Sequence, residues 1–171
     1  TLTVNGKTTA KDLTSEGTVT VGNKGTLTAD NIYINNGIFT ANGTVNSSKL
    51  ATAKGTTAAL AEATITGTVS NDGNLTLGGT TTISGNTTNA GTLTVNGKTT
   101  AKDLTSEGTV TVADKGTLTA ENIYINKGTF TANGTVNSSN LTTISGTGTV
   151  LGDTTITGSV TNAGNMTWNG I

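Results

Sequence analysis

Short runs in which polar and apolar residues alternate recur along the whole chain. GNLTLG, GTTTIS and GNTTNA (73–90) show the pattern, which runs glycine, outward, inward, outward, inward, turn. Alternation over four residues predicts a short, half-buried β-strand. Glycine or asparagine at the joints would supply the positive φ of a sharp corner. Three strands with three corners then make one coil of about 18 residues.

The chain is also an internal duplication with a period of 91 residues. Residues 1–49 recur at 92–140, and ATITGTVSNDGN (63–74) aligns with TTITGSVTNAGN (154–165) at the same offset. Cutting before a recurring glycine divides each period into five coils. We therefore assign 1–90 to a first copy and 91–171 to a second, incomplete copy. Only six positions differ in the closely matched part: Gly22/Ala113, Asn23/Asp114, Asp30/Glu121, Asn36/Lys127, Ile38/Thr129 and Lys49/Asn140.

These patterns predict an all-β fold, a single-stranded parallel β-helix (β-solenoid) that is continuous over 1–171. Helices are disfavoured because threonine and glycine form them poorly and no segment has apolar spacing of three and four. Coils of 17 and 20 residues depart from strict hexads, which favours right-handed winding. Parallel ladders should pair Leu93 with Val110 and Val110 with Phe130. Each coil should begin within two residues of Gly17, Gly37, Gly55, Gly73, Gly91, Gly108, Gly128, Gly146 or Gly164.

The alternation assigns an outward threonine ladder to the first strand of each coil. Sixteen of its twenty outward positions are threonine and none is charged, whereas the second face is less regular. The same register directs Thr57, Ala59 and Val150 inward, and Thr56 and Ala58 outward. Inward Thr87 and Asn89 should hydrogen-bond along the axis. Candidate surface-contact residues on the ladder are Thr18, Thr20, Thr92, Thr94, Thr109, Thr111, Thr129, Thr131, Thr147 and Thr149.

Composition excludes several kinds of chemistry. Histidine, cysteine and arginine are absent, charged residues make up 11%, and the net charge is −1. A Cys/His zinc site, a Ser-His-Asp triad and a thiol nucleophile are therefore ruled out. The acids are scattered, so we expect no enzyme activity, no metal and no cofactor. The lack of basic patches and long apolar runs argues against nucleic-acid binding and against membrane insertion of this segment.

The coils resemble the β-helical passenger regions of bacterial type V-secreted adhesins, namely the autotransporters and the filamentous-haemagglutinin-like exoproteins. The resemblance rests on GTLTVNG, GTVTV–KGTLTA, NIYIN-G and G-FTANGTVNSS, and covers the whole chain. It implies a right-handed parallel β-helix on a bacterial surface, often serving as a stalk. It transfers no receptor-binding residue to this chain.

The leading interpretation is a structural repeat segment of a bacterial cell-surface adhesin or extracellular fibre. It would act as a rigid stalk and as a weak multivalent binding surface, located outside the cell. Partners would be neighbouring repeats or copies end to end, or a host or bacterial surface protein or glycan. Tyr33 and Tyr124, which recur in NIYIN, are candidate aromatic contacts. Two alternatives stay open: an ice-binding solenoid that uses the threonine ladder, and a filament subunit that stacks end to end.

Overall fold

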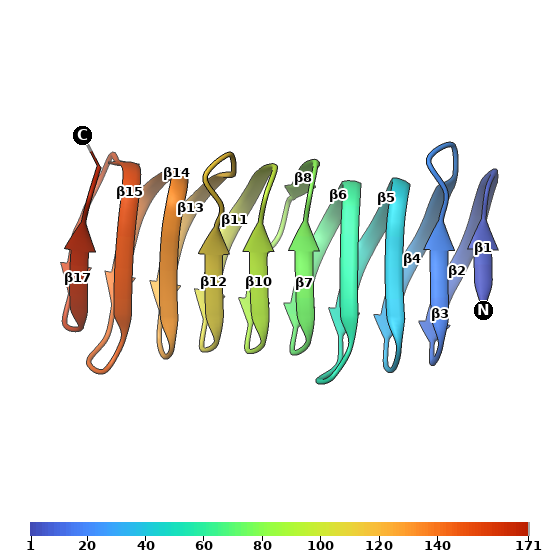
Figure 1. Ribbon diagram of the computed structural model, residues 1–171, viewed down its shortest axis with the longest axis horizontal. Coiled ribbons are helices and arrows are strands. Elements are labelled where there is room, and N and C mark those ends of the chain that lie inside the picture. Colours follow the sequence, from blue (N-terminus) through green and yellow to red (C-terminus); the bar gives the residue numbers. More distant parts are fainter. Residues whose placement is uncertain (171) are drawn as a thin grey trace.

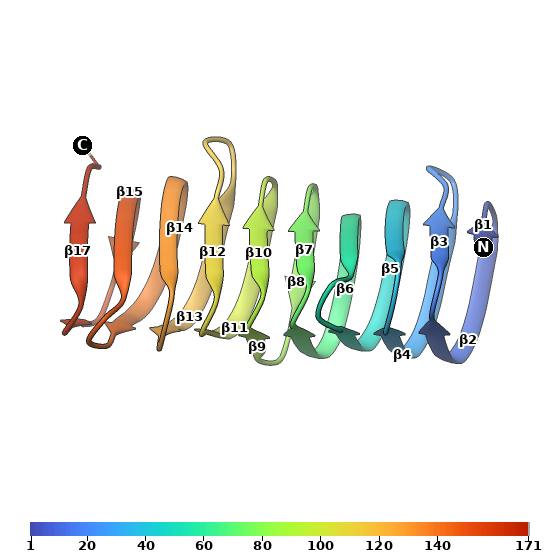
Figure 2. The same ribbon diagram turned by 60° about the horizontal axis from the view of Figure 1, so that its bottom comes forward.

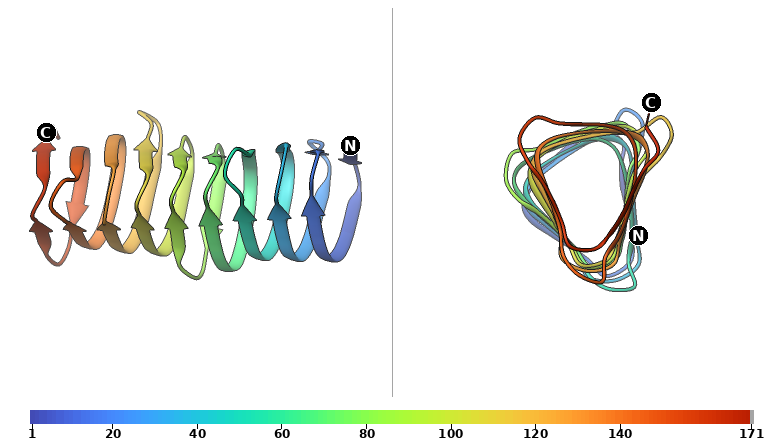
Figure 3. Two further views of the ribbon diagram at one scale, coloured as in Figure 1. Left: turned by 90° about the horizontal axis from the view of Figure 1, so that it is seen from below. Right: turned by 90° about the vertical axis from the view of Figure 1, so that its left-hand side faces the viewer.

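A computed structural model describes residues 1–170, which form a β-solenoid without helices, as predicted. Every strand pairing is parallel. In Figure 1 the chain rises along the front strands, descends behind them and advances from right to left, which is right-handed winding. The axial view in Figure 3 shows a three-sided cross-section. We number the faces 1 to 3 in the order in which the chain meets them.

Face 1 carries one short strand from each coil. Its strands are β1 (Leu2–Val4), β3 (Thr18–Val21), β7 (Asn74–Leu77), β10 (Thr92–Val95), β12 (Thr109–Val112), β17 (Asn165–Trp168) and the first four residues of β5 (Ile38–Thr52), β6 (Thr57–Asn71), β14 (Thr129–Thr143) and β15 (Gly148–Ile156). The strands begin one or two residues after the predicted glycines. Leu93 pairs with Val110, and Val110 with Phe130, so the predicted ladder is confirmed.

Faces 2 and 3 are formed by longer strands than expected. Strands β2 (Lys7–Ser15), β4 (Thr26–Ile34), β11 (Lys98–Ser106) and β13 (Thr117–Ile125) pass from face 2 onto face 3, and β5, β6 and β14 run along all three faces. Only β8 (Thr80–Ile83), β9 (Thr87–Asn89) and β16 (Val160–Asn162) are confined to one of these two faces. The strands continue through the corners because residues there still hydrogen-bond to the preceding coil. For example, Thr44 N donates to Gly25 O at 3.0 Å.

A single apolar core fills the solenoid. Phe39, Phe130 and the leucine, isoleucine and valine side chains of the inward positions are almost completely buried. AALAEA (58–63) lies in β6 and is a strand. The core is shallower at the outermost described coils, where Leu2 and Trp168 are 39% and 47% exposed because each coil there has one neighbour.

The predicted register is wrong by one residue in two coils. Ala58 and Leu60 point inward in place of Thr57 and Ala59, and Thr149 and Leu151 point inward in place of Val150. The cause is one extra residue in the preceding turn. At 53–56 the turn closes through Thr56 N to Ala53 O (3.2 Å) and Thr56 Oγ1 to the same oxygen (2.6 Å). Its third residue, Gly55, has a φ of 85°, as in a type II turn.

Most corner glycines are required for a reason other than the predicted positive φ. Among residues 1–170, positive φ occurs only at Gly37, Gly55, Gly128 and Gly146. At most of the other glycines a Cβ would strike the backbone of the preceding coil. At Gly97 it would lie 2.1 Å from Gly79 O, and at Gly108 2.1 Å from Gly91 O. Glycine therefore lets successive corners approach closely enough for the coils to stack at the strand spacing of about 4.8 Å.

A buried polar seam runs beneath the corner between faces 3 and 1. Thr52 Oγ1 donates to Asn71 Oδ1 (2.5 Å), Asn71 Nδ2 to Asn89 Oδ1 (2.7 Å), and Asn89 Nδ2 to Ser106 Oγ (3.2 Å). The predicted axial bonding of Asn89 is thus confirmed. Thr87 was predicted to bond in the same way, but its hydroxyl has no partner, and neither have those of Thr81, Thr99 and Thr149.

We expect Gly79→Ala to lower the free energy of unfolding by about 2–3 kcal/mol, because its Cβ would meet Ala61 O at 2.2 Å. Gly78→Ala is the matched control, since its nearest contact is an ordinary 3.6 Å to Leu60 O. It should change stability by less than about 1 kcal/mol. Urea unfolding measures both. Equal losses would show that close coil contact is not what demands glycine.

Removing polar groups from the core should have opposite effects at two positions. Asn71→Leu leaves the seam without its donor and acceptor, and should cost about 2–4 kcal/mol. Thr81→Val removes a buried hydroxyl that has no partner, and should be neutral or stabilising. Thermal unfolding of the two variants measures the difference, and a destabilised Thr81→Val would contradict this account of the core.

Candidate binding surface

Face 1 presents two outward columns of side chains aligned from coil to coil. The largest uninterrupted set, which we name the threonine block, consists of Thr92, Thr94, Thr109, Thr111, Thr129 and Thr131. Within it the pairings join Thr92 to Thr109 and Thr109 to Thr129, with Thr94, Thr111 and Thr131 alongside. Hydroxyls on one strand are about 6.7 Å apart and successive rungs about 4.8 Å. The block is therefore an uncharged patch three rungs long.

Outside the block the ladder is interrupted. The first column reads Thr18, Ile38, Thr57, Asn74 before the block and Gly148, Asn165 after it. The second reads Thr20, Thr40, Ala59, Thr76 before it and Val150, Thr167 after it. Thr18 and Thr20 therefore face outward as predicted, but an isoleucine, an asparagine and an alanine interrupt the threonines between them and the block.

Two of the candidate contact residues do not reach the surface. Thr147 and Thr149 are only 1% and 2% exposed, so their assignment to the outward ladder is wrong. Thr147 closes the turn at 144–147 by donating its hydroxyl to Ile144 O at 2.7 Å. This moves Thr149 to an inward position that pairs with Phe130. Thr56 and Ala58, predicted to point outward in the first copy, are buried in the same way.

Face 2 carries a more regular column than sequence reasoning indicated. Its second outward position is threonine or asparagine in every coil: Thr9, Thr28, Asn46, Thr64, Thr82, Thr100, Thr119, Asn137 and Thr155. The alternating sequence of face 2 contains this threonine and asparagine pattern. It is obscured by charged residues in the adjacent outward column, namely Lys7, Glu62, Lys98 and Asp153. A shallow groove of about 430 Å³ runs beside the column over small residues such as Ala101 and Ala120.

Carboxylates lie mainly at the corners, where neighbouring amides hold several of them. Asn31 Nδ2 donates to Asp12 Oδ1 (2.7 Å), and in the second copy Asn122 Nδ2 donates to Asp103 Oδ1 (2.8 Å). Glu16 accepts from Asn35 Nδ2 at 3.2 Å. Amides on the next coil, rather than a second carboxylate, thus partner these acids. The arrangement stabilises the corners and provides no acid–base pair.

Tyr33 and Tyr124 lie on face 3 and point outward between buried isoleucines. Tyr124 is 36% exposed, whereas the ammonium group of Lys49 lies 5.5 Å from the centre of the Tyr33 ring. In the second copy Asn140 stands in place of Lys49, so the two tyrosines differ in their surroundings. Each pairs with small or hydroxyl-bearing neighbours, Tyr33 with Thr14 and Ala51.

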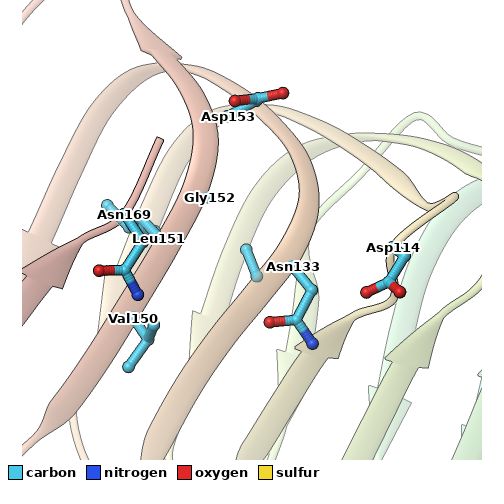
Figure 4. Close-up of a pocket in the computed structure, with 8 residues that line it drawn as sticks. Asp114, Asn133, Val150, Leu151, Gly152, Asp153 and Asn169 are labelled. Carbon is cyan, nitrogen blue, oxygen red and sulfur yellow. The ribbon is translucent and has the colours of Figure 1, made fainter. Parts of the chain in front are cut away.

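The hollows on the surface are shallow grooves between coils. One of about 320 Å³ is lined by Asp114, Asn133, Asp153 and Asn169, and Figure 4 shows that the carboxylates of Asp114 and Asp153 do not converge. Figure 2 shows the loops after β3 and β12 projecting from their corner, and the second of these, at 113–116, borders this groove. Within residues 1–170 no cluster of three or more His, Cys, Asp or Glu side chains is placed to hold a metal ion.

Comparisons with protein-family models, curated proteins and solved structures find no match to this chain. In the part that the structure describes, no helix is long and apolar enough to cross a membrane.

The corrected register makes a direct prediction for two threonines. Thr109→Tyr places its ring in solvent and should change the free energy of unfolding by less than about 0.5 kcal/mol. Thr149→Tyr forces a ring into the filled core beside Phe130 and should cost about 3 kcal/mol or more. Chemical denaturation compares them, and similar values would mean that Thr149 faces solvent.

Proposed function

We propose that this chain is a structural repeat segment of a bacterial cell-surface adhesin or extracellular fibre, in which it acts as a rigid stalk. The observation that carries the proposal is the continuity of coil-to-coil pairing. Leu75 of the first copy pairs with Leu93 of the second in the same way as strands pair within a copy. A copy therefore adds length without a linker or a hinge.

The internal bonding supports a stiff rather than a jointed stalk. Within 1–163 each coil is bonded to the next along all three faces, and the polar seam crosses the boundary between copies because Asn89 donates to Ser106. Bending at the boundary would break these bonds together. At about 4.8 Å per rung, five coils add about 24 Å to the length.

The surface chemistry suits exposure to solvent and weak, repeated contacts. Neutral hydroxyl and amide groups dominate the outward columns, while most charges lie at the corners, where they disfavour side-by-side aggregation. Contacts to a host or bacterial surface protein or glycan would come from repetition of the threonine block and of Tyr124, which gain avidity through copy number. We propose neighbouring repeats as the axial partners, an extracellular or cell-surface location and no enzymatic role.

Ice binding is a second candidate because the threonine block is uncharged and in register from coil to coil. The burial of Thr147 and Thr149 shortens the lattice to three complete rungs, which favours the stalk. Thermal hysteresis that is lost in Thr109→Tyr, with stability unchanged, would instead establish ice binding.

The stalk predicts that length scales with copy number. Adding one complete 91-residue copy in register should increase the maximum dimension in solution by about 24 Å and leave the cross-section unchanged. Small-angle X-ray scattering measures both quantities. A smaller increase with a wider cross-section would show that copies fold back on one another and would exclude the stalk.

The proposed location needs a separate measurement. Antibodies against the folded chain should label intact cells that produce the protein, without permeabilisation. Labelling that requires permeabilised cells would contradict a surface location.

A further inference from the structure

Six asparagine–glycine pairs occur in the chain: Asn5, Asn36, Asn42, Asn96, Asn133 and Asn169 each precede a glycine. In such a pair the glycine nitrogen can attack the asparagine side-chain amide, because no side chain shields it. The attack requires that the glycine N–H donates no hydrogen bond to a backbone carbonyl. It also requires that the asparagine side-chain amide lies next to this nitrogen. The fold therefore decides which pairs react.

Asn36–Gly37 meets both requirements. The Gly37 nitrogen lies 2.9 Å from Asn36 Oδ1 and donates to it, so the side chain is already folded back onto the atom that would attack. Among residues 1–170 no backbone carbonyl accepts from this N–H, because the ladder uses Asn36 N (to Ser15 O) and Ile38 N (to Gly17 O) instead. Asn36 is exposed, so water reaches the amide.

Asn96–Gly97 has the same two residues in a protected arrangement. The Gly97 N–H donates to Leu77 O at 3.1 Å, and Asn96 N donates to the same oxygen at 2.9 Å. The nitrogen is therefore held towards the preceding coil. The second copy also lacks a reactive counterpart of Asn36, because Lys127 precedes Gly128 there.

We propose that Asn36–Gly37 is a site of spontaneous covalent modification, a deamidation that the fold permits at this corner and suppresses at Asn96–Gly97. A solvent base removes the Gly37 N–H proton, and the nitrogen forms a bond to Cγ of Asn36. The Cγ–Nδ2 bond breaks and ammonia leaves with a proton, which closes a cyclic imide. Water then adds to one imide carbonyl and opens the ring to aspartate or isoaspartate.

The product strains the corner at which it forms. Isoaspartate inserts an extra backbone carbon just before Gly37, whose Cα is so close to the preceding coil that a Cβ would meet Gly17 O at 2.3 Å. Either product also adds a carboxylate to the corner that carries Glu16, the acceptor of the Asn35 amide. We expect the pairing of β3 with β5, which joins Val19 to Phe39, to loosen as the protein ages.

The test is site-resolved mass spectrometry of the chain incubated at mildly alkaline pH, once folded and once unfolded in urea. In the folded chain we expect Asn36 to convert about tenfold or more faster than Asn96, because the Asn96 pair reacts only after local opening. In urea the two rates should agree within a few-fold, and both should rise with pH. Asn36→Lys, which copies the second repeat, should abolish the product at this corner without changing the rate at Asn96.

Equal rates at Asn36 and Asn96 in the folded chain would overturn the proposal. So would an Asn36 that converts in urea but not in the folded state. Hydrogen exchange of aged wild-type protein should show faster exchange in β3 and β5 than in equally aged Asn36→Lys. Unchanged exchange after conversion would overturn the structural consequence.

Discussion

The structure depends on how closely one coil can approach the next at the corners. Face strands stack at the ordinary strand spacing, and the corners must keep that spacing while the chain turns. A side chain at Gly97 or Gly108 would place a Cβ 2.1 Å from a carbonyl oxygen of the previous coil. Glycine at these corners therefore allows the parallel ladder to continue from coil to coil. The ladder in turn aligns the inward and outward columns of side chains.

The alternating pattern and the 91-residue period were sufficient to predict the fold class, the coil boundaries and most of the core. They could not reveal the extra turn residue at 53–56 and 144–147, because a closing threonine resembles the outward threonines that surround it. The hydroxyl bonds of Thr56 and Thr147 to backbone carbonyls distinguish them, and these exist only in the folded chain. The one extra residue in the turn therefore places Thr149 in the core, where the alternating pattern had predicted a surface position.

The candidate site was predicted less completely than the fold. Eight of the ten candidate contact threonines face outward on face 1, but the continuous block is limited to three rungs. The column on face 2 was overlooked because charged residues occupy the position two residues earlier in four of its coils. Because threonine is so abundant in this chain, residue type alone does not distinguish an outward ladder position from a buried turn position. The strand register makes that distinction.

The polar seam has a consequence for how such a protein changes length over generations. Asn89, near the end of the first copy, donates to Ser106 in the first coil of the second copy. Ser15 is the equivalent residue in the first coil of the first copy. Unequal recombination between the segments that encode 1–49 and 92–140, which differ at six residues, would therefore insert a whole copy and recreate the same junction. Gene length could then vary in steps of five coils, and every new junction would inherit a hydrogen bond that already fits.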